Sequence, residues 1–568
     1  PNNNISLLFM PNVIGVNNIR DLKTFTTLGA DSGTYLQRTY QFYESRKQMI
    51  YQIKTEHYLP GSRLKIEFNA SYTKGKSNLP DLRVTPYIPA EAAIQNAPVY
   101  IIGNSIGTGR YYRYLDENIF DSRLSVELPL SKKTDLVRKI KLGLAYQNGT
   151  RQQDNYYYQL MEGNGSEYVR QANPDASAYG LDRFDIVTIQ NHSLAGDHGD
   201  SLRTVQQYYN RTLYPNNRVF GRSNIKAGYA MVDYAIIPVA RFSGGLRVEQ
   251  AYIYTDCNLF DDLHLAANDS RRMFVAPSPI LDIMIRPGKL NELSFLPSAG
   301  LILKLKNDEL SPVNLRLNYS KTVARPSIRE LSDNAYFDYE INKVVYGNSL
   351  LKMVQIDNYD IRLESYFKSG DNVSVSLFYK EFKNHIEVAD FGQYLIWINN
   401  ENTSWVKGIE LEGKKSIAKW LEFRANITLV DSRSAFNTTY TKPDGYTVTG
   451  RDVDRTMLNQ APYVINAMLT YFQEKAGLTA SISYNIQGPR VISTGSYKDI
   501  PDVYELPRNL VDIKVMKKLG KHYTVSLKIM DLMNSPIVRA YKIGDKYDLY
   551  FDSYKYGTNY VIAFSYKI

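Results

Sequence analysis

The sequence predicts an all-β fold, a large antiparallel transmembrane β-barrel of about 18–22 strands with short periplasmic turns and long extracellular loops. Three observations support this prediction. Apolar and polar residues alternate over long segments, the polar face of these segments carries full charges, and short links between segments alternate with long ones. Residues 1–568 are assigned to this one barrel.

The alternation has the period of a β-strand and the length of a membrane crossing. In the segment 64–73, Leu64, Ile66 and Phe68 fall on one face, and Lys65 and Glu67 fall on the other. Such segments run for ~9–12 residues, whereas strands of soluble sheets average ~5–6 and membrane strands need ~9–11. The pattern recurs at residues 140–146, 313–320, 373–379, 421–429, 478–484, 523–529 and 560–568. Length therefore favours a membrane barrel.

The two faces of these segments have different chemistry. The apolar face is predicted to contact lipid, through Leu64, Ile66, Phe68, Leu142, Leu144, Leu315, Leu317, Leu377, Ile482 and Phe564. A dry core would not tolerate the charges of the polar face, but a lumen does, and the charges predicted to face it are Lys65, Glu67, Arg316, Glu410, Glu412, Glu422 and Arg424. Water or the opposite charges of a plug are expected to offset their desolvation.

Tyrosine dominates the aromatic residues, with 47 Tyr against 21 Phe and 3 Trp. Tyrosines also stand at the ends of the alternating segments, and aromatic side chains gather where a barrel meets the two membrane surfaces. An interfacial girdle is therefore predicted from Tyr72, Tyr146, Tyr319, Tyr379 and Tyr484.

The links between segments are of two kinds. Turn-like links are found at residues 59–62, 368–372, 473–477 and 518–521. Long polar links are predicted at residues 74–121, 148–223, 255–276, 325–355, 432–460 and 488–507. Short turns on one side and long loops on the other are typical of an outer-membrane barrel.

Composition excludes several other classes of protein. The chain is 43% hydrophobic and has one cysteine, so neither a disordered chain nor a disulfide scaffold is expected. No run approaches the ~20 apolar residues of a membrane-spanning helix. The net charge of +10 is spread along the chain, so nucleic acid is not expected as a partner. A propeller would repeat every ~40–50 residues, and no such repeat is seen.

The chain begins Pro1-Asn2-Asn3-Asn4, without the pattern of a signal peptide. The targeting information is therefore expected to lie upstream.

No enzyme activity, catalytic residue, metal or cofactor is expected. The segment Gly103–Gly107 fits G-x-S-x-G, but no helix follows it, so a glycine-rich loop is the better interpretation. His192 and His198, with Asp197 and Asp200, crowd one loop without the spacing of a known metal site, which favours a solvated loop.

Other polar groups are given structural roles. Cys257 is taken as incidental. Glu410 and Glu412 lie two residues apart on one strand and are expected to meet cations of neighbouring strands or of a plug. Arg325, Arg329 and Glu330 follow a strand and are expected to anchor a loop through ion pairs.

From about residue 35 onward the order of motifs resembles the barrel of TonB-dependent outer-membrane receptors. The most specific stretch is Tyr319–Leu331. The others are Arg110–Asn118, Ala227–Asp233, Gly244–Glu249, Leu296–Ser298, Gly347–Leu350, Asn358–Glu364, Val373–Lys380 and Gly408–Glu412. The sequence departs from the family pattern in two places. No plug or TonB box is recognisable, and the last side chain, Ile568, is aliphatic where an aromatic residue is usual.

The resemblance implies a multi-pass barrel of the Gram-negative outer membrane that takes up a scarce or bulky nutrient, a metal chelate, glycan or peptide. The implied partners are outer-membrane lipid, a plug from upstream residues or another chain, the TonB complex, and a surface lipoprotein lid or other outer-membrane subunits. The alternatives are a barrel subunit that scaffolds a larger complex without transport, and a plain porin.

Ligand contacts are expected in the long loops, where tyrosine rings can stack on sugars, chelates or peptides. The predicted contact residues are Tyr156, Tyr157, Tyr158, Tyr168, Tyr208, Tyr209, Tyr440 and Tyr446. Tyr179 belongs to the same set.

Overall fold

The structure of the chain is a computed structural model. It describes residues 3–25, 35–88, 99–100, 109–130, 136–162, 207–212, 218–257, 287–308, 310–332, 335–338, 343–390, 394–400, 402–437, 440–441, 447–448, 452–495, 501–544 and 546–567.

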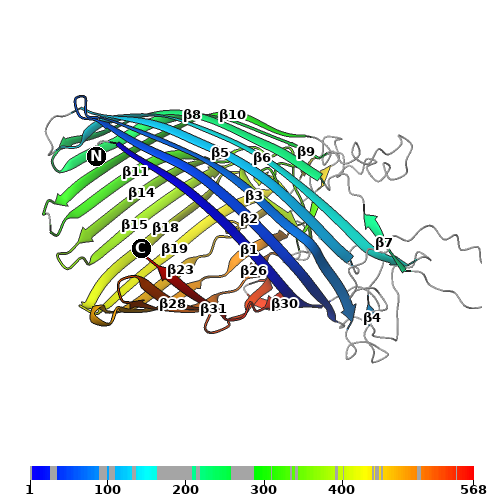
Figure 1. The fold of residues 1–568 in the computed structure, drawn as a ribbon. Coiled ribbons are helices and arrows are strands. Elements are labelled where there is room, and N and C mark those ends of the chain that lie inside the picture. The colour runs from blue at the N-terminus through cyan, green and yellow to red at the C-terminus, as the bar shows by residue number, and fades with distance from the viewer. Residues whose placement is uncertain are drawn as a thin grey trace, which may run out of the picture.

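Eighteen antiparallel strands follow one another in chain order around one curved sheet, which we call the wall (Figure 1). They are β1 (Asn3–Phe25), β2 (Tyr35–Leu59), β3 (Leu64–Ile88), β5 (Gly109–Pro129), β6 (Arg138–Glu162), β8 (Arg218–Ile237), β9 (Ala240–Asp256), β10 (Gly288–Lys306), β11 (Val313–Ala324), β14 (Val354–Tyr366), β15 (Asn372–Lys383), β18 (Ser404–Ala418), β19 (Leu421–Asn437), β23 (Tyr463–Gln473), β24 (Leu478–Gln487), β27 (Arg508–Leu519), β28 (Tyr523–Met530) and β31 (Asn559–Tyr566).

The predicted architecture is confirmed, because each wall strand pairs antiparallel with its neighbours in the chain. Short strands extend three of the hairpins, namely β4 (Val99–Tyr100), β7 (Gln207–Thr212) and β22 (Asp452–Arg455). In the described residues, β1 and β31 stand at the two edges of the wall and do not pair with each other, so the sheet curls without closing.

Short turns gather at one end of the wall, on the left in Figure 1, and the long links gather at the other end, which we call the mouth. Three of the predicted turns contain a glycine with positive φ, at Gly370 (77°), Gly477 (60°) and Gly520 (66°). Glycine adopts this conformation without the steric cost that a side chain brings.

Several predicted loop boundaries are wrong. β2, β3 and β6 each run for 25 residues, or ~80 Å at ~3.3 Å per residue. The arms of these hairpins therefore continue past the membrane, into the predicted loops 74–121 and 148–223. The prediction ended each strand where its apolar face ended. Beyond the membrane the backbone pairing continues although the lipid no longer requires apolar side chains.

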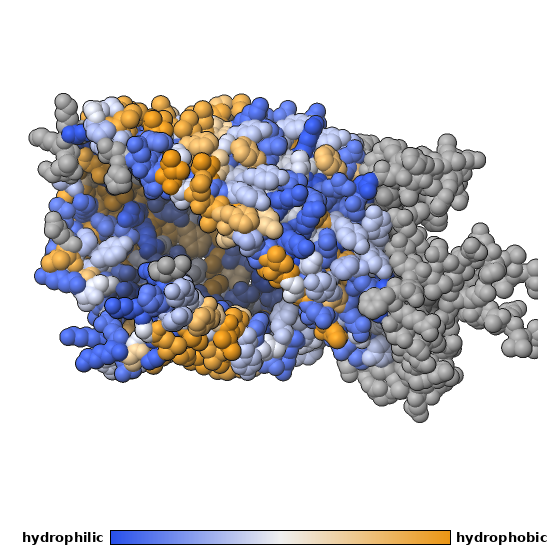
Figure 2. All heavy atoms as spheres, in the orientation of Figure 1, coloured by the Kyte–Doolittle hydropathy of each residue, from blue (hydrophilic) through white to orange (hydrophobic). Residues whose placement is uncertain are grey.

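The predicted lipid face is exposed and apolar. Six of its residues are among the exposed large hydrophobic side chains, namely Phe68, Leu142, Leu144, Leu377, Ile482 and Phe564, and Leu64, Ile66, Leu315 and Leu317 are half-buried. Figure 2 shows an apolar band around the part of the wall near the short turns, with hydrophilic residues beyond it toward the mouth.

The predicted tyrosine girdle is seen as rows of rings on neighbouring strands. Ring centroids lie 5.1 Å apart for Tyr319 and Tyr359 and 6.2 Å apart for Tyr359 and Tyr379. Tyr146 is 6.3 Å from Phe120. Tyr72 lies 6.4 Å from Tyr51, and the hydroxyl of Tyr484 donates to Asn509 at 2.6 Å.

The charges on the opposite, inner face pair mainly with one another. Lys65 contacts Glu67 at 2.5 Å, and Glu67 also contacts Lys141 at 3.4 Å. Similar pairs join Arg316 to Glu364, Arg362 to Glu364 and Glu412, and both Lys414 and Arg424 to Glu422. The cation that Glu412 meets is thus Arg362 of β14, which is separated from β18 by β15. Pairing within the wall thus supplies part of the compensation that was expected from water or a plug.

A second sheet of eight strands lies at the mouth, and we call it the loop sheet. In spatial order it contains β12 (Ala335–Asp338), β13 (Lys343–Tyr346), β17 (Tyr394–Asn400), β16 (His385–Asp390), β25 (Arg490–Gly495), β26 (Val503–Glu505), β29 (Ile537–Ile543) and β30 (Lys546–Tyr554). The predicted loops 325–355 and 488–507 therefore contain strands.

The remaining described elements are small. β20 (Tyr440–Thr441) pairs with β21 (Thr447–Val448), and η3 (Glu474–Ala476) is a single 3-10 turn between β23 and β24. Within the described residues, the structure contains no helix with the length and apolarity of a membrane span.

Candidate functional site

The loop sheet joins strands from four different links. β12 and β13 come from the link after β11, β16 and β17 from that after β15, β25 and β26 from that after β24, and β29 and β30 from that after β28. Two parallel pairings, β13 with β17 and β16 with β25, connect hairpins that are separate in the chain. The loop sheet bypasses the β19–β22 hairpin and runs as an inner layer beside the wall.

Two strands of the loop sheet, β16 and β17, pack against β9 and β10. Ile386 of β16 and Trp397 of β17 contact a buried apolar cluster that includes Ala251, Ile253 and Leu290 of the wall. Ala251 and Ile253 lie on the opposite face of β9 from the exposed Leu246, so they lie on the inner face. The loop sheet is therefore anchored inside the mouth.

The segment 325–332 folds into the same cluster, and close backbone contacts require glycine there. A Cβ on Gly347 would lie 1.8 Å from the carbonyl oxygen of Ser332, and one on Gly288 would lie 2.1 Å from that of Leu331. Thr255 donates its hydroxyl to the Leu331 carbonyl at 3.1 Å.

Arg325 forms an ion pair with Glu249 of β9, which is the loop-anchoring role expected of it. Glu330 acts locally instead. Its carboxylate accepts from the amide of Ser327 at 2.8 Å, and the hydroxyl of Ser327 accepts from the Glu330 amide at 3.2 Å. The two family-like stretches Tyr319–Leu331 and Gly347–Leu350 are thus brought together, and Asn348 donates its amide to the carbonyl of Glu330 at 2.7 Å.

Gly347→Ala should displace the turn 327–332 from the inner face, because the new Cβ cannot coexist with the Ser332 carbonyl. Overpacking of this kind costs about 1–3 kcal/mol. Limited proteolysis of the folded protein should show faster cleavage near 327–332. Gly413→Ala is the matched control, since a Cβ there meets nothing within 4 Å. Equal cleavage rates for the two variants would contradict the prediction.

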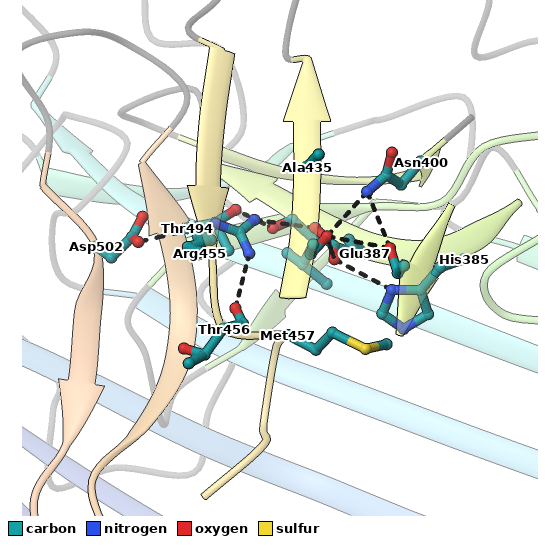
Figure 3. Close-up of polar contacts among 12 residues, drawn as sticks. His385, Glu387, Asn400, Ala435, Arg455, Thr456, Met457, Thr494 and Asp502 are labelled. Carbon is teal, nitrogen blue, oxygen red and sulfur yellow. Dashed lines mark hydrogen bonds and ion pairs between the residues drawn. The ribbon is translucent and has the colours of Figure 1, made fainter. Parts of the chain in front are cut away.

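A buried polar cluster fixes the middle of the loop sheet to the β19–β22 hairpin (Figure 3). Glu387 of β16 is 0% exposed. Its Oε2 accepts from Nη2 of Arg455 at 2.9 Å, and its Oε1 lies 2.6 Å from the Ser434 hydroxyl and 3.1 Å from Nδ1 of His385. Nε of Arg455 is also 3.8 Å from Asp502. Burial favours the neutral acid, but the bond to His385 and the charge of Arg455 outweigh it and lower the pKa of Glu387 to about 2.

The lowered pKa of Glu387 predicts acid sensitivity of the loop sheet. A carboxyl whose pKa is lower in the folded state contributes stability above its ordinary pKa and loses it as the pH falls through the folded value. The contribution should therefore be full above about pH 4.5 and be lost toward about pH 2. In the natural chain, the amides of β16 and β25 should lose protection from hydrogen exchange as the pH falls through that window. In Glu387→Gln the same amides should show no such step, and a step that persists would contradict the assignment.

A second buried cluster joins β30, the last strand of the loop sheet, to β1. Asp552 of β30 contacts Arg539 at 3.2 Å and Arg20 of β1 at 3.5 Å, and the guanidinium of Arg20 lies 4.1 Å from the ring centroid of Tyr554. Burial raises the pKa of Asp552 despite the two arginines. The loop sheet therefore follows the inner face of the wall at the mouth, from the neighbourhood of β9 and β10 to β1.

The predicted ligand tyrosines are only partly brought together. Tyr156, Tyr157 and Tyr158 lie on β6, and Tyr208 and Tyr209 lie on β7, which pairs with the end of β6. The ring of Tyr156 is 6.3 Å from that of Tyr114 in an edge-on contact. Tyr440 lies apart on β20.

The segment Arg110–Tyr114 of β5 was missed as a ligand candidate. Tyr111 pairs with Tyr157 and Tyr112 with Tyr156, so β5, β6 and β7 form a tyrosine-rich ribbon at the mouth. The cluster around Glu387 was also missed, because its members come from separate links. In the sequence, the concentration of tyrosines in Arg110–Tyr114 was the one feature that could have pointed to this ribbon.

Some predicted sites lie outside the described residues. These are Tyr168, Tyr179 and Tyr446, the segment Gly103–Gly107, and the group His192, Asp197, His198 and Asp200. Cys257 is described and is not in a disulfide. In the described part of the chain, no group of three or more His, Cys, Asp or Glu side chains has the arrangement of a metal site.

A curved antiparallel wall with an apolar outer band, a charged inner face and an inner sheet along its mouth is the architecture of an outer-membrane barrel. The chain belongs to the family described as TonB dependent receptor-like, beta-barrel, which it matches over residues 20–532. The match confirms the resemblance seen in the sequence.

Two solved structures have a similar fold. The siderophore receptor PiuA from Acinetobacter baumannii is 13% identical, with a TM-score of 0.56 over 98% of this chain and 77% of that chain. The closed form of the ferric-catecholate import receptor Fiu from K12 E. coli is 10% identical, with a TM-score of 0.50 over 100% of this chain and 81% of that chain. A search of curated proteins gives no match.

Proposed function

We propose that this chain is the transport barrel of a Gram-negative outer-membrane receptor that imports a ferric chelate with energy delivered through TonB. The observation that carries the proposal is the loop sheet, which lines the mouth of a wall with a charged inner face in a chain of this family. A ferric chelate is favoured over a glycan or peptide because the two similar folds are named as a siderophore receptor and a ferric-catecholate import receptor.

In this proposal the mouth faces the outside of the cell, and the ligand first meets the tyrosine-rich ribbon. The side chains of Tyr114 and Tyr156 lie on the outer face of this ribbon, so the ligand contact is placed on its inner face, where Tyr111 offers an aromatic ring for a planar chelating group. The protein binds and releases its ligand and carries out no covalent chemistry.

The partners follow from the family. A plug from upstream residues or another chain occupies the lumen, and the TonB complex acts on that plug. A surface lipoprotein lid or other outer-membrane subunits are further partners of the mouth. A plain porin is disfavoured because the chain matches the TonB-dependent receptor family, and no feature of the described residues favours a scaffold without transport.

Uptake of radioactive iron tests the proposal. The receptor is produced in a Gram-negative host that lacks its own chelate receptors, and ferric chelates of several classes are offered one at a time. At least one chelate should enter, and only in cells with TonB. Uptake of a glycan or peptide in place of iron would overturn the substrate class. Uptake that persists without TonB would overturn the receptor proposal itself.

The plug is tested by conductance. Barrels of roughly twenty strands enclose a lumen that passes small solutes unless it is filled. In planar bilayers the 568-residue chain should conduct ions, and a form that also carries a plug should be closed. Equal conductance of both forms would defeat the plug proposal and favour the porin or the scaffold.

A further inference from the structure

An apolar groove of about 540 Å³ crosses the outer face of β1, β2, β3 and β5. The strand register explains its shape. A row of four aromatic side chains, Phe9, Tyr51, Tyr72 and Phe120, forms the edge nearer the mouth. The neighbouring row contains the small residues Ala70 and Ser122, which leave room for a chain-like apolar ligand.

Three lysines stand just beyond the aromatic row, toward the mouth. Lys74 follows Tyr72 by two residues on the same face of β3, and Lys76 follows by four. Lys47 of β2 lies directly opposite Lys76 in the register. Like charges directly opposite in an antiparallel pair are destabilising. A bound anion would relieve the repulsion between these lysines, so this surface favours an anion.

The protein supplies little negative charge of its own here. Asp116 of β5 contacts Lys76 at 3.1 Å, and both side chains are about half exposed. Among the described residues, Lys47 and Lys74 have no ion-pair partner, and both side chains are exposed. The patch keeps an excess of positive charge beside the groove.

We infer that this surface binds a phosphorylated, acylated lipid of the outer leaflet. Successive rows on one face of a strand are ~7 Å apart. The lysines therefore lie one and two rows beyond the aromatic residues, and the groove lies one row before them. Aromatic residues of a barrel sit at headgroup level. The phosphate is then held by Lys74 and Lys76, and an acyl chain fills the groove over Ala70.

The assignment to the outer leaflet rests on the proposed function, which places the mouth outside the cell. The binding chemistry itself does not depend on transport. A phosphorylated lipid fits better than a zwitterionic one, because the net charge of the lysine patch matches an anion and not a neutral headgroup.

Native mass spectrometry of the receptor, purified from outer membranes in mild detergent and titrated with diphosphoryl lipid A, tests the inference. The double variant Lys74→Gln, Lys76→Gln should bind about tenfold more weakly or worse, as expected for two lysines near an anionic headgroup. Ala70→Phe, which fills the groove and keeps the lysines, should weaken binding similarly. The control is Lys407→Gln, which also removes an exposed lysine paired with an aspartate, on β18.

The inference would be overturned if the lysine double variant and Ala70→Phe both bound lipid A as tightly as the natural receptor does. It would also be overturned if the natural receptor bound phosphatidylethanolamine and lipid A equally. Retained heat-modifiable migration on gels shows that each variant is folded. The assay involves no uptake, so a failed uptake experiment and a failed lipid experiment remain distinguishable.

Discussion

Glu387→Gln is expected to release the middle of the loop sheet from the β19–β22 hairpin. The substitution removes one charge of a buried pair and leaves Arg455, whose side chain is 5% exposed, opposite a neutral amide. Breaking a buried ion pair in this way costs about 3–5 kcal/mol. Amide exchange in β16 and β25 should therefore become much faster, while exchange in the wall stays unchanged.

Two further variants isolate the cause. Glu474→Gln removes an exposed carboxylate from η3, in a short turn at the other end of the wall, and should have no effect on β16 or β25. The double variant Glu387→Met, Arg455→Met removes both charges and should recover part of the protection, because two apolar residues avoid an unpaired buried charge. Unchanged exchange in Glu387→Gln would show that the ion pair does not hold the loop sheet.

Leu142→Arg is expected to give the largest loss of stability among substitutions of the outer face. Leu142 is 53% exposed and lies on β6 midway between Tyr146, beside Phe120, and Arg138, whose guanidinium is 4.7 Å from the ring centroid of Tyr234. These aromatic residues mark the two edges of the apolar band. An arginine facing lipid near the bilayer midplane costs about 2–4 kcal/mol.

Urea unfolding from lipid vesicles measures this cost. Gln147→Arg introduces the same charge on the same strand but on the inner face, where charged side chains already pair, and it should cost much less. Leu142→Ile should be nearly neutral. If the arginines at 142 and 147 had equal effects, the assignment of the two faces would be wrong.

The wall could be predicted from the sequence because its rules are local. Alternation at Leu64–Tyr72 and a lipid solvent fix which side chains face out, and neighbouring strands pair in chain order. Turns such as that at Gly370 are marked by residue types. The same local rules failed past the membrane, where the strands continue without an apolar face.

The loop sheet could not be predicted, because its pairings depend on where the wall places distant links. Glu387 stands in the segment Ile386-Glu387-Val388-Ala389, which is an ordinary alternating strand. Nothing near it in sequence identifies Arg455 as its partner, and the two residues meet only when the wall has brought β16 and β22 together. The tyrosine-rich ribbon was half predicted, since Tyr156–Tyr158 were chosen for their composition while their partners on β5 were not.

The long-range pairings of the loop sheet have a consequence for the order of assembly. Thr494 donates its hydroxyl to the carbonyl of Val388, 106 residues earlier in the chain, whereas wall strands pair with their immediate neighbours. Contacts between neighbouring hairpins form faster than contacts that first require a long loop to close. The wall is thus built hairpin by hairpin, and the mouth acquires its inner layer only after both flanking parts of the wall are in place. A nascent barrel passes through a stage that is wider at the mouth than the finished protein.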